Sequence, residues 1–147
     1  MGLVPGESRM RELSDIICNQ SPLTLPPSAT VQEACGRMKE RRVGAVLVTD
    51  EGGALVGIFT GRDAVGVLAA GKSGAKTKLA HVMTPNPTTM HPKKSALDAL
   101  RLMWDGGFRH VPLVEGGRLA GVVSRGDFKD YEKERFEEER ELWEHMR

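Results

Sequence analysis

One short run occurs twice in this chain, as GIFTGRD at residues 57–63 and as GVVSRGD at residues 121–127. In each copy a glycine and two apolar residues lead to a hydroxyl residue, and an aspartate follows three positions later. The pairs are Thr60 with Asp63 and Ser124 with Asp127. This pattern predicts a strand that turns into a helix, because the hydroxyl and the carboxylate can form a capping box. Such a turn can also hold a sugar and a phosphate, since a carboxylate accepts hydrogen bonds from ribose hydroxyls and the N–H groups at a helix start attract phosphate.

The two runs belong to a longer internal repeat. Residues from Pro22 to Val48 correspond to residues 65 positions later, and residues from Leu55 to Asp63 correspond to residues 64 positions later. In each copy a capping pair opens a helix with one apolar stripe, and two short apolar strands follow. The helices are expected to begin at Thr30 and Ser95, and the strands to cover 45–48, 55–59, 111–114 and 119–123. The repeat predicts two copies of one supersecondary unit packed face to face.

The repeat divides the chain into five parts. We expect a loose lead-in over residues 1–12, a first repeat over 13–71, a linker over 72–78, a second repeat over 79–130 and a charged helix over 131–147. No Gly or Pro follows Asp127, so the helix after it is expected to run on to the end of the chain. Its apolar residues make no clean heptad, so it is suited both to lie against its own domain and to contact a dimer mate or partner.

Length and charge narrow the function classes. The 147 residues carry 21 basic and 20 acidic side chains, a net charge of +1, which gives no overall field toward nucleic acid or an anionic membrane. Only seven aromatic residues are present, which disfavours a single-strand-binding surface. The sequence shows neither a signal peptide at its start nor an apolar run of membrane-spanning length, so we expect a cytoplasmic protein.

Reaction chemistry finds little support in the residues. Cys18 and Cys35 form neither a CxxC pair nor a disulfide framework, and His81, His91 and His145 are too scattered for a metal site. The chain has no Walker loop and no GxGxxG run, and it offers no nucleophile with an orienting base. We therefore expect a binding protein without an obligatory cofactor, not an enzyme.

With the repeat, the order of elements and the paired runs in hand, the sequence resembles a tandem pair of CBS domains, also called a Bateman module. The resemblance covers residues 13 to 130 and extends to two leading segments, around 14–17 and 80–85. It implies a mixed α/β fold in which two βαββα units pack about a pseudo-two-fold axis and leave two clefts between them. It further implies adenosine-containing ligands, of the AMP, ADP, ATP or S-adenosylmethionine type, and pairing of two modules into a flat homodimer.

The resemblance also implies roles for individual residues. Asp63 and Asp127 would hold ribose hydroxyls, while Thr60 and Ser124 would lie beside ribose or phosphate. The remaining implied ligand-binding residues are Ile58 and Val122 in the adenine slots, Val43, Gly44, Ala45, Phe108, Arg109 and His110 before the first long strands, and Cys18, Ser21, Leu23, Thr84 and Thr88 in or just after the leading segments. Each cleft is expected to draw on both repeats.

The two repeats are not equivalent. Arg109 and His110 offer cationic or hydrogen-bonding groups for phosphate, whereas Gly44 and Ala45 at the matching positions offer none. Arg62 and Arg125, next to the two helix starts, can add charge to either cleft. The first leading segment departs from the family pattern, because it reads Ile-Cys-Asn at 17–19 and is one residue longer. We therefore expect the two clefts to bind differently.

Two functions from different classes fit these patterns. The first is a regulatory module that senses an adenosine-containing ligand and transmits a change of packing, through the tail helix, to an unidentified regulated protein. The alternative is an oligomerisation or docking scaffold that needs no ligand. In that case Asp63 and Asp127 are only helix caps, and the tail helix is the partner surface.

Overall fold

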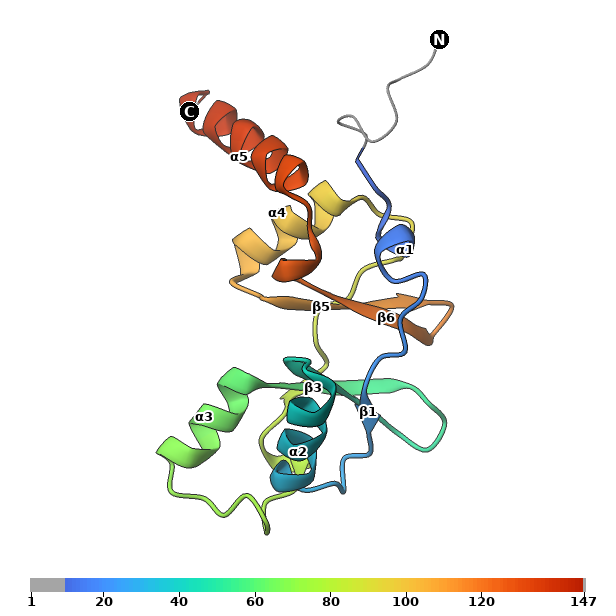
Figure 1. Ribbon diagram of the computed structural model, residues 1–147, viewed down its shortest axis with the longest axis vertical. Coiled ribbons are helices and arrows are strands. Elements are labelled where there is room, and N and C mark those ends of the chain that lie inside the picture. Colours follow the sequence, from blue (N-terminus) through green and yellow to red (C-terminus); the bar gives the residue numbers. More distant parts are fainter. Residues whose placement is uncertain (1–9, 147) are drawn as a thin grey trace.

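The chain folds into two lobes that lie end to end, as seen in the computed structural model, which describes residues 10–146 (Figure 1). The lower lobe in Figure 1 carries a four-stranded sheet of order β1-β2-β3-β4. Its elements are β1 (Thr24–Leu25), α2 (Val31–Arg41), β2 (Ala45–Thr49), β3 (Leu55–Thr60), α3 (Gly61–Ala69), the 3-10 turn η1 (Leu79–His81) and β4 (Thr84–Pro85). Strand β1 runs parallel to β2, and the other neighbours are antiparallel.

The upper lobe is built around the antiparallel hairpin of β5 and β6. Its elements are α1 (Leu13–Ile16), α4 (Ala96–Gly106), β5 (His110–Glu115), β6 (Arg118–Ser124), the 3-10 turn η2 (Arg125–Asp127) and α5 (Asp130–His145). A single parallel bridge joins Met90 to Leu113, which corresponds to the pairing of Leu25 with Val48 in the lower lobe. The mixed α/β architecture of two repeated units with a C-terminal helix is therefore confirmed.

The first helices of the two repeats form where their capping residues lie. The Glu33 N–H donates to Thr30 Oγ1 over 3.1 Å at the start of α2, and the Asp98 N–H donates to Ser95 Oγ over 3.1 Å at the start of α4. Both helices end at a residue with positive φ, the usual stop for a helix. The predicted apolar stripes face the cores: the buried members are Val31, Ala34, Met38, Ala96, Ala99, Leu100 and Met103, and Cys35 is half-buried.

The leading segments are exchanged between the lobes. Leu13 of α1 is fully buried in the core of the upper lobe, and its N–H donates to the carbonyl of Lys94. Leu79 of η1 is buried in the core of the lower lobe, and its N–H donates to the carbonyl of Ala29. Each lobe thus contains the leading segment of the other repeat. The division into repeats at 13–71 and 79–130 describes the sequence, and it stays a prediction.

The expectation of one helix running on from Asp127 is wrong. Only the three residues of η2 are helical there, and Phe128 is extended, with φ −87° and ψ 145°. Phe128 is 4% exposed and packs in the upper core, so the backbone leaves the helical region to bury its ring. A second helix, α5, then begins at Asp130. The predicted lead-in lies outside the described residues as far as residue 9, as does residue 147 of the tail.

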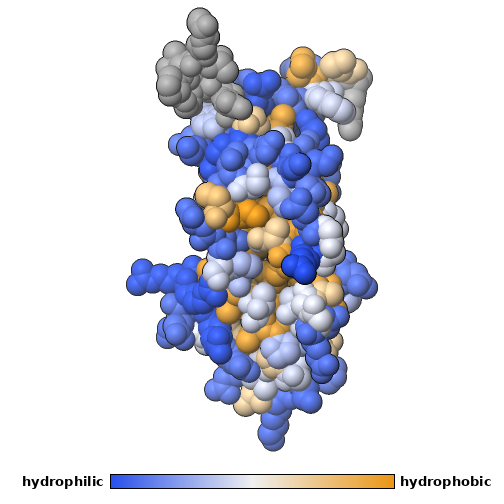
Figure 2. Space-filling model, turned by 90° about the vertical axis from the view of Figure 1, so that its right-hand side faces the viewer, coloured by the Kyte–Doolittle hydropathy of each residue, from blue (hydrophilic) through white to orange (hydrophobic). Residues whose placement is uncertain are grey.

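The tail helix packs against its own lobe from its start as far as Arg140. Phe136 is buried, its ring centroid lies 6.1 Å from that of Trp104 on α4, and Arg101 forms a 2.8 Å ion pair with Glu139. Figure 2 shows that, on one side of the molecule, apolar side chains reach the surface mainly midway along it and below, while the upper part is mostly hydrophilic. At the end of α5, Leu142, Trp143 and Met146 are exposed. The tail therefore contacts its own domain and still presents an uncovered apolar end.

Candidate ligand-binding cleft

A cavity of about 480 Å³ lies where the two lobes meet, and we call it the first cleft. This volume falls in the range of small-molecule sites. The lower lobe contributes the end of β3, the first turn of α3 and β4, and the upper lobe contributes the turn into β5. The lining residues are Gly44, Ile58, Thr60, Gly61, Arg62, Asp63, Thr84, Asn86, Pro87, Thr88, Gly107, Phe108, Arg109 and His110.

Thr60 and Asp63 form the capping box at the start of α3. The Thr60 N–H donates to Asp63 Oδ2 over 2.9 Å, the Thr60 hydroxyl donates to the same oxygen over 3.2 Å, and the Asp63 N–H donates to Thr60 Oγ1 over 3.4 Å. Within residues 10–146 no donor reaches Oδ1 of Asp63. The carboxylate can therefore cap the helix with one oxygen and accept hydrogen bonds from a ligand with the other.

Positive charge surrounds the first cleft without a neutralising ion pair among the described residues. Arg62 follows the cap on α3, and Arg109 comes from the opposite lobe, so both line the cavity from different sides of the interface. The first turn of α3 also lies on the cavity wall, and the N-terminal end of a helix dipole carries partial positive charge. Together these groups favour an anionic ligand group beside Asp63.

His110 is the half-buried group at the contact between the lobes. A Cβ at Gly44 would come within 3.2 Å of His110 Nε2, so the absence of a side chain at 44 lets the imidazole approach the lower lobe. Burial lowers the pKa of His110, with the Asp127 carboxylate raising it and the Arg109 guanidinium lowering it by smaller amounts. The imidazole is therefore neutral at pH 7 and can present one N–H donor to the cavity.

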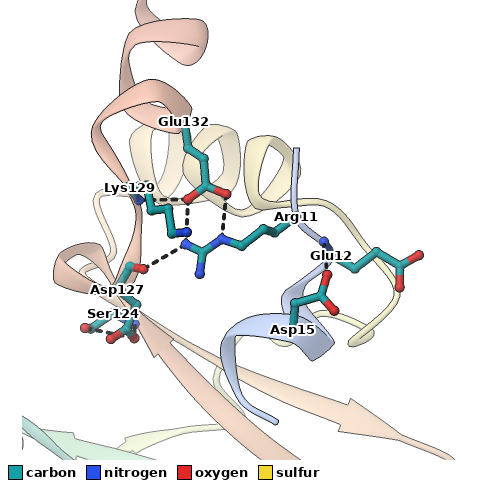
Figure 3. Close-up of polar contacts among 7 residues, drawn as sticks. All are labelled: Arg11, Glu12, Asp15, Ser124, Asp127, Lys129 and Glu132. Carbon is teal, nitrogen blue, oxygen red and sulfur yellow. Dashed lines mark hydrogen bonds and ion pairs between the residues drawn. The ribbon is translucent and has the colours of Figure 1, made fainter. Parts of the chain in front are cut away.

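In the second repeat, the end of β6 and the turn η2 correspond to the end of β3 and the start of α3. We call the region beside them the second cleft. Ser124 and Asp127 form the same capping box, since the Ser124 N–H donates to Asp127 Oδ2 over 2.7 Å and the Ser124 hydroxyl donates to it over 3.2 Å. The helix that follows is only the three-residue η2, so no long helix dipole is aimed at this place. Arg11 donates to the carbonyl of Asp127 over 3.1 Å (Figure 3).

Arg11 also joins the second cleft to the tail. Its Nε and Nη2 donate to the two carboxylate oxygens of Glu132, over 3.0 Å and 2.7 Å, and Figure 3 shows this pair beside the Ser124–Asp127 cap. The Glu132 side chain is fully buried and also accepts from the Lys129 N–H over 2.8 Å. Burial acts to raise the pKa of Glu132, but these hydrogen bonds outweigh it and hold the pKa below its ordinary value. The sequence did not single out either residue of this ion pair.

The structure gathers about half of the predicted ligand residues in the first cleft. Those that line it are Gly44, Ile58, Thr60, Asp63, Thr84, Thr88, Phe108, Arg109 and His110. Those outside its lining are Cys18, Ser21, Leu23, Val43, Ala45, Val122, Ser124 and Asp127. Leu23 and Ala45 are buried, so they serve the core of the lower lobe rather than an open surface. The roles of all of these residues in ligand binding stay predictions.

Four cavity residues were missed as ligand-binding positions: Gly61, Asn86, Pro87 and Gly107. Asn86 and Gly107 could have been found, since Asn and Gly favour positive φ at turns, and both adopt it here, at 46° and 70°. Arg62 was noted only as charge beside a helix start. Arg62 lines the cavity because β4 and the turn into β5 lie close to the end of β3, where α3 begins.

Two further properties bear on the kind of site. Among the residues that the structure describes, no three His, Cys, Asp or Glu side chains gather closely enough to hold a metal ion. No helix within residues 10–146 combines the length and apolar character that crossing a bilayer requires.

A family model described as the CBS domain matches residues 13–70 and again residues 79–134. The chain belongs to the CBS-domain family. The predicted tandem CBS pair is therefore confirmed. The CBS domain-containing protein CBSCBSPB1 of Arabidopsis thaliana is 37% identical over 124 residues, which are 84% of this chain. The chain spans 22% of the length of that relative.

Solved CBS structures resemble this CBS pair closely in fold. The CBS domain protein PAE2072 from Pyrobaculum aerophilum, in complex with AMP, superposes with a TM-score of 0.79 at 23% identity, over 86% of this chain and 98% of that one. At that identity the likeness shows the fold alone. The CBS domain pair of protein MJ0100, in complex with 5′-methylthioadenosine and S-adenosyl-L-methionine, has a TM-score of 0.73 at 26% identity, over 80% of this chain and 95% of that one.

Proposed function

We propose that this CBS pair is a regulatory module that binds an adenine nucleotide in the first cleft. The observation that carries the proposal is the meeting of Asp63, which has one uncommitted carboxylate oxygen, with Arg62 and Arg109 in one cavity. A carboxylate is the acceptor that a ribose diol requires, and guanidinium groups bind phosphate through paired N–H donors. The adenosyl compounds bound by the MJ0100 pair support the same ligand class.

The first cleft has residues of suitable chemistry for each part of a nucleotide. Asp63 faces the ribose, while Arg62, Arg109 and the first turn of α3 face the phosphates. Ile58 and Phe108 offer apolar surface to the base. Two guanidinium groups favour a phosphorylated ligand over S-adenosylmethionine, whose sulfonium carries positive charge where a nucleotide carries negative charge. AMP, ADP and ATP are thus the preferred candidates within the adenosyl class.

Binding acts through the packing of the lobes. Arg109 and His110 belong to the upper lobe and Asp63 to the lower one, so a ligand that touches all three favours one relative placement. That placement is read by a partner, or by a second copy in a homodimer, without turnover of the ligand. Exposed apolar side chains on α3, Val65 at 64% and Leu68 at 76%, offer surface for such contacts.

One observation favours the alternative of a docking scaffold. At the end of α5, Leu142, Trp143 and Met146 are exposed, by 59%, 65% and 77%, among mostly charged residues. Apolar side chains gathered at the end of a helix are suited to contact with another protein. In this alternative the capping boxes at Thr60 and Ser124 are structural only.

Calorimetric titration separates the two functions. AMP, ADP, ATP and S-adenosylmethionine are titrated into the native chain and into Asp63→Ala at low ionic strength. At least one phosphorylated nucleotide is expected to bind the native chain, at least tenfold more tightly than S-adenosylmethionine, with the difference shrinking as salt is added. Absence of binding by all four compounds, or equal binding by Asp63→Ala, leaves the scaffold as the function.

A further inference from the structure

The outer edges of β3 and β6, the second long strands of the two repeats, are hydrogen-bonded by different groups. In the lower lobe β4 pairs with β3, so that Ile58 lies opposite Thr84. Val122 is the residue of β6 that corresponds to Ile58, 64 positions later. Its backbone is satisfied by the side chain of Gln20: the Val122 N–H donates to Gln20 Oε1 over 2.7 Å, and Gln20 Nε2 donates to the Val122 carbonyl over 2.8 Å. A side-chain amide here takes the place of a strand.

Gln20 reaches this position because its segment is one residue longer. Met83 packs over Gly57 and Ile17 packs over Gly121, which aligns the two leading segments. Four residues then separate Ile17 from Pro22 (18–21), whereas three separate Met83 from Pro87 (84–86). The extra residue lets the chain bulge and turn the Gln20 side chain onto β6 instead of continuing as a strand like β4.

The carboxamide also fills the space above β6. A Cβ at Gly121 would lie 2.7 Å from Gln20 Oε1 and 2.9 Å from Ile17 Cδ1, so both side chains are in tight contact with this strand. The segment is held in place, because the Gln20 N–H donates to the carbonyl of Ile17 over 2.9 Å and the Arg41 guanidinium donates to the carbonyl of Ser21. The N–H and the carbonyl of Val122 are thus both engaged by Gln20, and neither is free to bind the base of a ligand.

We infer that Gln20 closes the second cleft, so that each chain binds one nucleotide, in the first cleft. The inference rests on the proposed function for the identity of the ligand. Two other features of the second cleft agree with it: η2 provides only three helical residues, and the Asp127 carbonyl is engaged by Arg11 (Figure 3). Gln20 therefore decides the number of ligands per chain.

Equilibrium dialysis with radiolabelled AMP and ATP counts the sites. The native chain and Gln32→Ala, the matched control that removes the other glutamine, are expected to bind one nucleotide per chain. Gln20→Ala is expected to bind two, because its second cleft is opened, with the added site the weaker by tenfold or more. Two sites in the native chain, or a single site in Gln20→Ala, would overturn the inference.

Hydrogen exchange tests the closure without any ligand. The amide of Val122 is followed in the native chain, in Gln20→Ala and in Gln32→Ala. Loss of its acceptor is expected to speed exchange of this amide at least tenfold in Gln20→Ala only. Equal rates in all three chains would overturn the inference even if no nucleotide binds, whereas faster exchange together with no binding would leave the closure standing and remove the proposed function.

Discussion

The two repeats begin from the same capping box and end in different structures. After Thr60 and Asp63 the chain forms the nine-residue helix α3, whose first turn borders an open cavity. After Ser124 and Asp127 it forms only a 3-10 turn, and it then buries Phe128 and starts the tail helix. The first copy therefore borders space that a ligand can enter. The second copy is joined through Arg11 to Glu132 of the tail helix.

A duplicated sequence motif therefore does not by itself create a duplicated binding site. Arg109, from the second repeat, adds positive charge to the first cleft, and the second cleft is covered by Gln20, which lies in the leading segment of the first repeat. The properties of each cleft therefore depend on a residue from the other repeat. Four expected effects, taken from the largest to the smallest, test this difference.

The largest effect is expected where the second repeat holds the tail. Glu132→Ala leaves the Arg11 guanidinium without its partner in a mostly buried place, and we expect the free energy of unfolding to fall by about 3 kcal/mol. Because the pKa of Glu132 is lowered in the folded chain, the stabilisation is present above its ordinary pKa and is lost as the pH falls below it.

Urea denaturation at pH 7 and pH 4 measures this effect. Glu134→Ala, which removes an exposed glutamate from the same helix, is the control and should change stability by less than about 0.5 kcal/mol. If Glu132→Ala is as stable as the control, the ion pair does not fasten the tail.

The second effect compares the two aspartates directly. Asp63→Ala removes the ribose acceptor and is expected to weaken nucleotide binding by about 2 kcal/mol, or roughly 30-fold. Asp127→Ala should change the affinity by less than about threefold, because its cleft is closed and its effect is on the cap. Titration calorimetry on both variants gives the comparison.

A cap control accompanies this pair of variants. Asp98→Ala breaks the equivalent capping box of α4, away from the first cleft, and should lower stability without weakening nucleotide binding. Equal losses of affinity in Asp63→Ala and Asp127→Ala would show that the two clefts are alike after all.

The third effect concerns phosphate. Arg109→Gln keeps a polar side chain, although a shorter one, and removes its charge, and we expect nucleotide affinity to fall about tenfold, or about 1.4 kcal/mol, at low salt. Arg125→Gln, beside the second cleft, is the matched control and should leave the affinity within about twofold. An equal loss in both variants would mean that long-range charge, and not contact in the first cleft, attracts the nucleotide.

The smallest effect is a pH dependence. The pKa of His110 is lowered by burial, so as the pH falls the unfolded chain takes up this proton before the folded chain does. The stability gained by keeping His110 neutral is present above a pH of about 6.5 and is lost as the pH falls below it. Thermal melts of His110→Gln between pH 8 and pH 5 should therefore fall less steeply than those of the native chain.

The exposed His81 provides the control for that series. His81→Gln should retain the native slope of melting temperature against pH. An unchanged slope in His110→Gln would show that other groups, and not the imidazole at the contact between the lobes, cause the loss of stability in acid.

Local features of the fold were predictable from the sequence. The helix caps at Thr30, Ser95 and Thr60, the apolar stripes of α2 and α4 and the two hairpins all depend on residues within a few positions of one another. The cap and the absence of Gly and Pro also predicted a helix that runs on after Asp127, and there the burial of Phe128 prevailed over the local preference. A local sequence pattern does not show that other elements form a core into which Phe128 can be buried.

The order of amino acids is enough to predict the repeat, the turns at Asp63 and Asp127 and the unequal residues at 44 and 109. Folding in three dimensions is needed to bring Arg109 and Asp63 to one cavity, to bind Gln20 to the Val122 backbone and to pair Arg11 with Glu132, 121 residues away. The reason is that capping and periodicity are short-range properties. Contacts between the lobes depend on how the leading segments cross from one lobe to the other, and no local pattern encodes that crossing.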